Sequence, residues 1–514
     1  MNILNQFSEK INGKFTSFDR IIINGYLRGL ININSFSFYL YQQGIYAYNF
    51  KPFAEAQTKE LCEHIESFVK DNGCSTEYLT SSKISKDELV NDCFSKNPNK
   101  KGLIAAFSIV ESCKVITVKS KSSEFISRPT KCKHYYLYFN DDVFGRMFIR
   151  IQTWFPYNVE IYINGHEYLA KVFDKFNIKY EMFNNSFSYI DDFDKAQKIA
   201  DNAFFNKNFT ASFDKLVSQI NIHLPKIKEL MDESYYYCVN QCEFALDINF
   251  KSVSDLNPIY KKLTETAFFT LECDNIYSFF GRNIKYISNI RKGNITSDFK
   301  SWYQGYRIKF KLNKNQVKMY NKGNNLRIEV TINNPNDFKV LKNISNDDNI
   351  NDNDSNTDSS KKRLVPMAKS ISNLYRYALV SKSIIDRFID ALPNIDIENN
   401  IPKEDIQKIS SRTIFNDRVY SGFNILNSEN IKLFSTISNG KYTIDGFTNK
   451  SIINDLFDEA SKKNINKLTR TFAKLRAFGI IKKVDGKNKY FLTNFGRNIC
   501  NSILLYFNKQ LLGF

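Results

Sequence analysis

The chain of 514 residues is 42% hydrophobic and 15% aromatic, which excludes a disordered protein and predicts more than one domain. Its net charge of +18 favours a polyanionic partner, because each neutralised phosphate releases counterions. The sequence lacks an apolar run of membrane-spanning length, and its amino terminus lacks the charged start and apolar core of a signal peptide, so we expect neither a membrane partner nor secretion.

The cysteines and histidines exclude several chemistries. Nine cysteines are scattered without a framework, which indicates reduced thiols and a cytoplasmic protein. Cys238 and Cys242 lack a second pair at a matching distance, so we interpret them as small strand residues. The four histidines are isolated, which excludes HExxH helices and other His-pair metal motifs.

The sequence patterns of the first two regions differ. Residues 1–98 read mostly as helices, and we assign 1–102 to a helical N-terminal region. From residue 103, β-branched and aromatic runs separated by turns predict strands, and a helical pattern follows to residue 232. Residues 103–232 are therefore predicted to form an α/β sheet domain.

Basic and aromatic side chains alternate along these predicted strands. They are Lys131, Lys133, Tyr135, Tyr136, Tyr138, Arg146, Arg150 and Trp154. Exposed rings beside cations suit single-stranded nucleic acid, through base stacking and phosphate attraction. The alternative is that the rings belong to the core.

The fold class that we predict is α+β, a multidomain mixed antiparallel-sheet body with a C-terminal winged helix-turn-helix. Residues 233–342 carry a strand, a helix and an antiparallel set, the order of a ferredoxin-like unit. Residues 343–362 are predicted to form a disordered acidic loop. Residues 363–427 are assigned to a helical connector, with a long helix from Pro366 to Leu392.

A catalytic site is predicted on the strands of the ferredoxin-like unit. Lys318, Tyr320 and Lys322 alternate on one strand face, and Glu329 shares a face with Arg327 on the next strand. The proposed catalytic residues are Glu243, Asp247, Tyr320, Lys322 and Glu329, of which Glu243, Asp247 and Glu329 are the metal ligands. Carboxylates suit Mg²⁺, the candidate cofactor, which could hold a phosphodiester that Tyr320 then either attacks or only orients. The alternative is a set of cross-strand ion pairs.

Residues 428–514 carry the clearest functional pattern. A short helix at 451–457 precedes a second at 465–478, whose apolar residues recur at helical spacing and which Gly479 ends. Two short strands follow, joined by Asp485-Gly486, a hairpin signal. Helix, helix and basic hairpin is the order of a winged helix-turn-helix.

The charge of this segment favours nucleic acid. Residues 461–499 contain eleven Lys or Arg and one acid. The predicted nucleic-acid-binding residues are Lys467, Arg470, Thr471, Lys474, Arg476, Lys482, Lys483, Lys487, Lys489 and Arg497. The alternative is a winged helix used for protein contact.

Several blocks resemble an uncharacterised bacterial family whose members end in a MarR-like winged helix. These blocks are residues 18–27, 152–157, 164–170 and 317–339. The resemblance spans most of the chain and implies a C-terminal winged helix, but no activity. Separately, about fifteen residues around Lys318–Glu329 look like a strand pair of phage and plasmid replication initiators. The paired metal-binding histidines of many such enzymes are missing.

We therefore expect a cytoplasmic nucleic-acid-binding protein of a mobile or replicating element. The winged helix would bind duplex DNA, and the α/β body would bind or process a strand. Three alternatives stay open: a metal-dependent endonuclease or replication initiator, an RNA-binding ribonucleoprotein component, and a MarR-like transcriptional regulator.

Overall fold

The computed structural model describes residues 6–511, except 82, 98, 120–121, 184, 206–208, 283–294, 303–304, 344–361, 393–402, 444 and 458. The chain is mixed α/β with a large mixed sheet, and it forms two compact units. Unit 1 consists of residues 1–15, 246–330 and 380–514, and unit 2 of residues 16–245 and 331–379. Each unit thus combines segments far apart in sequence, whereas the sequence suggested consecutive regions. In the described part of the chain, no helix has the length and apolarity needed to cross a membrane.

The sheet of unit 2 runs in the order β9, β1, β6, β5, β4, β3, β2. The strands are β1 (Ile11–Tyr26), β2 (Thr76–Tyr78), β3 (Gly102–Val118), β4 (Phe125–Asp141), β5 (Gly145–Gln152), β6 (Val159–Asn164) and β9 (Tyr236–Phe250), of which β1 from Thr16 and β9 to Ala245 belong to this unit. β3 and β4 form a long antiparallel hairpin, while β2 pairs with β3 in parallel, which makes the sheet mixed.

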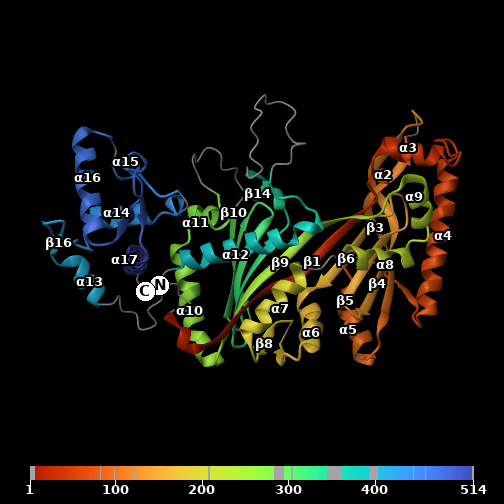
Figure 1. Ribbon diagram of the computed structural model, residues 1–514, viewed down its shortest axis with the longest axis horizontal. Helices are drawn as coiled ribbons and strands as arrows, with labels where there is room; N and C mark the ends of the chain where they lie inside the picture. Colours follow the sequence, from red (N-terminus) through yellow and green to blue (C-terminus); the bar gives the residue numbers. More distant parts are fainter. Residues whose placement is uncertain are drawn as a thin grey trace. The chain divides into compact units, whose positions relative to one another are not determined.

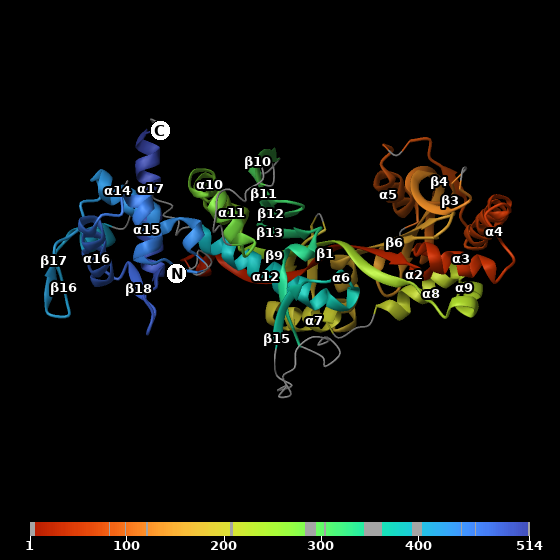
Figure 2. The same ribbon diagram turned by 90° about the horizontal axis from the view of Figure 1, so that it is seen from above.

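Helices and short strands complete unit 2. They are α2 (Arg28–Ile31), α3 (Ile33–Tyr41), α4 (Phe50–Asp71), α5 (Lys86–Lys96), α6 (Gly165–Lys175), α7 (Phe193–Phe205), α8 (Thr210–Ile220), α9 (Leu224–Met231), and the pairs β7–β8 (Tyr180–Met182, Phe187–Ile190) and β14–β15 (Lys339–Asn343, Lys362–Pro366). α4 lies beside β3 (Figures 1 and 2) and buries Ala54, Leu61, Ile65 and Val69, a stripe at helical spacing.

The body of unit 1 is an antiparallel meander with helices. β10 (Ile295–Trp302), β11 (Gly305–Leu312), β12 (Asn315–Lys322) and β13 (Asn325–Ile332) lie in chain order, and the last part of β9 follows β13. α10 (Val253–Thr270) and α11 (Cys273–Phe279) connect β9 to this set, and α12 (Leu374–Ala391) contributes Phe388, whose ring contacts Phe279 and Phe310. One strand face is therefore apolar, while the other carries the polar residues discussed below.

The C-terminal part of unit 1 has its own apolar core. It contains α13 (Lys403–Ser410), β16 (Thr413–Phe415), β17 (Arg418–Tyr420), α14 (Ser428–Ser438), a 3₁₀ turn η6 (Gly440–Tyr442), α15 (Asn449–Leu456), α16 (Lys462–Ala477), β18 (Ile481–Lys483), β19 (Tyr490–Leu492) and α17 (Asn494–Leu511). Phe434, Ile452, Leu468, Phe472 and Ile480 are among its buried residues. Figure 2 shows α14, α15 and α16 together, with β16 and β17 beside α16. We call residues 428–511 the C-terminal module.

The module meets α11 at a glycine. A Cβ on Gly440 would lie 2.5 Å from the backbone nitrogen of Asn275, closer than real Cβ contacts allow. The backbones of η6 and α11 can approach this closely only because position 440 has no side chain.

Two predictions of helix are wrong. β1 makes residues 11–26 a strand, because the run Ile21-Ile22-Ile23 is β-branched and packs well on a pleated sheet. The helix predicted from Pro366 begins at Leu374, and Pro366 ends β15 instead. The predicted acidic loop at 343–362 falls largely outside the described residues.

Candidate nucleic-acid interface

α16 presents one apolar and one basic face. Leu468, Phe472 and Leu475 are buried in the core of the C-terminal module, which turns the opposite face outward. On the exposed side, Lys463, Lys467 and Arg470 follow the i, i+4, i+7 spacing of one helix face. The helix begins earlier than the sequence suggested, because the Ser461 hydroxyl accepts from the Asn464 amide and caps it. The first-turn cations Lys462 and Lys463 were therefore missed, although Ser461 was a readable cap signal.

The hairpin after α16 adds more exposed cations. β18 and β19 pair antiparallel, with Lys483 opposite Tyr490. Gly486 has φ +70°, which the tight turn requires. The side chains of Lys482, Lys483 and Lys487 are exposed. We call the exposed cations of helix and hairpin the basic surface: Lys462, Lys463, Lys467, Arg470, Lys482, Lys483 and Lys487.

Acidic partners are scarce on the basic surface. Lys467 Nζ lies 3.0 Å from Glu429 Oε2, and both side chains are largely exposed, so this ion pair is weak. Within the described part of the chain, the other six cations have no carboxylate within ion-pair distance. Their charge is therefore available to an external anion.

The remaining predicted residues lie elsewhere. Lys474 donates to the Gly422 carbonyl over 3.0 Å and lies above the Phe423 ring, and burial lowers its pKa. Arg476 lies over the Phe415 ring, and the Thr471 hydroxyl donates to the Lys467 carbonyl. Lys489 is half-buried.

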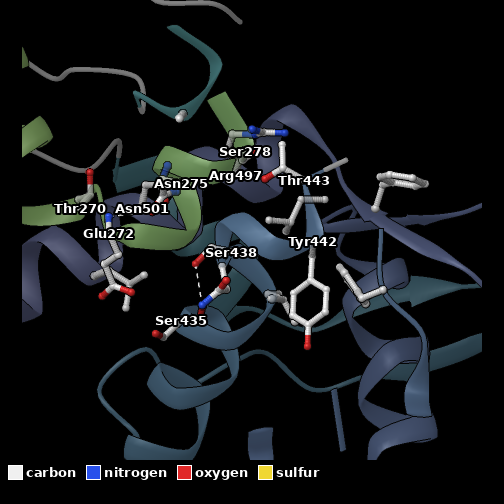
Figure 3. A pocket seen from close by; sticks show the side chains of 17 residues that line it. Thr270, Glu272, Asn275, Ser278, Ser435, Ser438, Tyr442, Thr443, Arg497 and Asn501 are labelled. Carbon is white, nitrogen blue, oxygen red and sulfur yellow. Dashed lines mark hydrogen bonds between the residues drawn. The ribbon is translucent and has the colours of Figure 1, made fainter. Parts of the chain in front are cut away.

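Arg497 points away from the basic surface. Its guanidinium donates to the Asp390 carbonyl over 3.2 Å, and burial lowers its pKa. It lines a cavity of about 190 Å³ with polar groups from α11, α14 and α17, among them Asn275, Ser438 and Asn501 (Figure 3). Arg497 was therefore predicted on an interface but lies at an internal polar cavity of unit 1.

The predicted catalytic strands form a buried charged cluster. Arg327 is fully buried, and its Nη1 lies 3.1 and 2.9 Å from the two carboxylate oxygens of Asp247. Glu329 accepts from Lys318 Nζ at 2.6 Å and from the Tyr320 hydroxyl at 2.7 Å. The convergence of a phenol, cations and a carboxylate predicted from strand alternation is thus present.

Electrostatics in this cluster favours the ionised form of Glu329. Despite desolvation, which opposes ionisation, the adjacent Lys318 and Arg327 lower the pKa of Glu329 from 4.5 to about 2. Lys322 Nζ lies 5.9 Å from the centroid of the Tyr320 ring. Glu243 lies on β9 four residues before Asp247, and its Oε2 is 3.7 Å from Arg20 Nε.

The carboxylate oxygens of Asp247 and Glu329 already have partners in the protein. The ion needs carboxylate oxygens that are open to it and to water, but Asp247 uses both oxygens on Arg327, and Glu329 uses both on Lys318 and Tyr320. A divalent cation would also meet the charges of Arg327 and Lys318 at short range. Asp247, Arg327, Lys318 and Glu329 therefore form the cross-strand ion pairs expected as the alternative, and the Mg²⁺ site stays a prediction from which we derive no cleavage step.

The prediction of an exposed aromatic surface on β4 and β5 is wrong. Tyr135, Tyr136 and Tyr138 are all buried, and the Tyr135 and Tyr136 hydroxyls donate to Glu66 and Glu111. Their cationic neighbours are paired as well: Lys133 with Glu66, Arg146 with Glu167, and Arg150 with Glu111 and Glu160. Lys131 is exposed, and the Trp154 indole donates to the Ile116 carbonyl. An aromatic-rich chain uses such rings for its core.

A buried polar network in unit 2 was not visible in the sequence. His166 is fully buried, with Nε2 2.9 Å from the Ser17 hydroxyl and Nδ1 2.7 Å from the Asn185 carbonyl. Asp19 accepts from the Asn185 amide. A Cβ on Gly165 would lie 2.1 Å from the Phe18 carbonyl, so α6 starts directly against β1. The network joins two blocks quoted for the family resemblance, and its burial gives it a structural role.

Comparison with known proteins finds no matching family model, no matching curated protein and no matching solved structure. The resemblance to a family with a MarR-like winged helix therefore stays an expectation.

Proposed function

We propose that the protein binds nucleic acid, and that duplex DNA lies on the basic surface of the C-terminal module. The observation that carries the proposal is the set of exposed cations on α16 and the β18–β19 hairpin, six of which lack an acidic partner among the described residues. Cations of this kind release counterions when phosphates replace them, which drives association.

The order of elements supports a winged helix-turn-helix. α15 and α16 are separated by a short connection and contact each other, and the hairpin follows directly after α16. In this arrangement the second helix enters a major groove while the wing reaches the backbone. The ferredoxin-like interpretation of residues 233–342 stays a prediction.

The position of the first-turn lysines is a further argument for phosphate binding. The amino end of a helix carries a partial positive charge, so cations there reduce the stability of the helix. α16 has Lys462 and Lys463 in its first turn and no acid there. The same two lysines that destabilise the free helix would attract an anion to its amino end.

A fluorescence-anisotropy titration of the full chain with labelled duplex DNA, at several salt concentrations, tests the proposal. We expect binding that weakens with salt, with a logarithmic slope of about −0.9 for each phosphate neutralised. Absence of binding to both duplex and single strands at low salt would refute it. Tighter binding to RNA than to DNA would select the ribonucleoprotein alternative instead.

One observation favours the regulator as a second candidate. The polar cavity of about 190 Å³ lies against α14 and α17 of the C-terminal module, with the Arg497 guanidinium and Glu272 carboxylate in its lining (Figure 3). A small polar or zwitterionic ligand there would contact helices of the module. The test is whether small carboxylates or amino acids raise the melting temperature of the full chain and lose that effect in Arg497→Gln.

A further inference from the structure

Three potential metal ligands converge on the β3–β4 hairpin of unit 2. Cys113 Sγ lies 3.0 Å from Cys132 Sγ, and Cys132 Sγ lies 4.0 Å from His134 Nδ1. One donor atom from each residue lies within 4.8 Å of the other two. Both cysteines are half-buried and His134 is buried, so the group is accessible from its sulfur side.

Strand register explains why these side chains meet. Cys113 pairs with Thr130, and Cys132 pairs with Glu111, so the two cysteines are diagonal neighbours on one face of the hairpin. His134 follows Cys132 by two residues on the same strand and therefore shares that face. The sequence contains the Cys-x-His spacing, but Cys113 is distant along the chain and becomes a neighbour only through strand pairing.

The donor set suits a thiophilic ion. Thiolate and imidazole are the ligands of protein zinc sites, at about 2.3 Å and about 2.0–2.1 Å from the ion. Two sulfurs on one tetrahedral zinc lie about 3.8 Å apart, so Cys113 and Cys132 need to separate by less than about 1 Å. With three protein ligands, the exposed side leaves the fourth position to water.

The imidazole is already oriented by the backbone. Its Nδ1 lies 3.1 Å from the Cys132 carbonyl oxygen, the kind of partner that fixes the ring of a metal-bound histidine. The ring nitrogen that lies 4.0 Å from Cys132 Sγ is this same Nδ1, so metal binding through Nδ1 replaces the carbonyl contact, whereas binding through Nε2 keeps it.

A disulfide is the competing interpretation. Diagonal neighbours on adjacent strands have Cα atoms about 7–8 Å apart, whereas disulfides join Cα atoms about 4.4–6.8 Å apart. A metal ion spans the longer separation because two sulfur–metal bonds replace one sulfur–sulfur bond. With the sulfurs 3.0 Å apart, both products need a shift of about 1 Å, and the oxidation arm of the experiment distinguishes them.

We propose that Cys113, Cys132 and His134 form a binding site for a thiophilic metal ion, with Zn²⁺ as its probe. The ion links β3 to β4 across the hairpin. The proposal is independent of nucleic-acid binding, because the basic surface contributes none of the ligands.

The experiment measures zinc bound to the full-length chain. Reduced protein is loaded with Zn²⁺, exchanged into metal-free buffer, and analysed by native mass spectrometry and by elemental analysis. We expect one zinc per chain in the parent, and at least a tenfold loss of affinity in both Cys113→Ser and His134→Gln. Zinc should raise the melting temperature of the parent only, and a chelator should reverse this.

Cys93→Ser is the matched control, because Cys93 is half-buried on α5 and is not a ligand. It should keep one zinc per chain. Retention of zinc in Cys113→Ser, equal loss in Cys93→Ser, or no zinc in the folded parent would each overturn the proposal. Loss of two hydrogens on mild oxidation of the parent but not of Cys113→Ser, without zinc binding under reduction, would establish a disulfide at this pair instead.

Discussion

Unit 1 contains lysines and arginines in two opposite settings. In the charged cluster on β12 and β13, Arg327 and Lys318 are matched by Asp247 and Glu329 and removed from water. On the basic surface, the same residue types are exposed, and six of the seven have no ion-pair partner among the residues that the structure describes. The contrast teaches that the number of lysines and arginines alone does not predict nucleic-acid binding. A cation in a buried pair interacts with the protein itself, while an exposed unpaired cation remains available to a partner.

The largest expected effect comes from breaking the buried cluster. Arg327→Met leaves Asp247 and Glu329 without a fully buried cation, which should reduce the free energy of unfolding by about 3–5 kcal/mol. Urea denaturation measures this. Lys101→Gln is the control, since its pair with Asp142 is exposed to water and its loss should leave the free energy of unfolding almost unchanged. Equal stability of Arg327→Met and the parent would contradict the structural role of the cluster.

Substitutions on the basic surface should lower the affinity for DNA and not the stability of the fold. Replacing Lys482 and Lys483 with Gln should weaken duplex binding by about tenfold or more at low salt and reduce the salt slope by about two, with stability almost unchanged. Anisotropy titration gives both quantities. The double control Lys51→Gln, Lys59→Gln removes the same charge from α4, where each lysine pairs with a glutamate. A similar loss in that control would show that net charge, and not the surface, governs binding.

Acid should weaken the buried cluster. The pKa of Glu329 is lowered from 4.5 to about 2, so its stabilisation is present above pH 4.5 and is lost as pH falls toward 2. The full shift corresponds to roughly 3 kcal/mol. We expect Glu329→Gln to have a smaller loss of stability between about pH 5 and pH 3 than the parent, measured by urea denaturation. A parallel decline in both proteins would contradict this.

The smallest effect concerns the acid beside the basic surface. Glu429→Gln removes the exposed partner of Lys467, which should change stability by less than about 0.5 kcal/mol. It also removes a negative charge, so duplex binding should tighten slightly, by less than about threefold. Weaker binding in this variant would indicate that Glu429 positions Lys467 for contact.

Local patterns predicted the parts of the molecule that depend on neighbours in sequence. The spacing of Leu468, Phe472 and Leu475 gave the buried face of α16, and Asp485-Gly486 gave the hairpin. Alternation along β12 and β13 placed Lys318 and Tyr320 beside Glu329. In these cases the periodicity of the element decides which side chains share a face.

The predictions that failed concern residues whose partners lie far along the chain. Asp247 is 80 residues from Arg327, so the sequence offered ion pairs as an alternative but did not identify these two residues as partners. The burial of Tyr135 and Tyr136 depends on which face of β4 is covered, and alternation does not specify that. Cys113 and Cys132 meet through the register of a long hairpin, which the sequence does not fix.

The contact at Gly440 has a practical consequence. Since a Cβ at this position would lie 2.5 Å from the Asn275 nitrogen, even one methyl group would act as a wedge between η6 and α11. Gly440→Ala would therefore weaken the packing of the C-terminal module against α11 without changing any charge. If that single methyl group changes the affinity for DNA, the packing between η6 and α11 influences DNA binding by the module.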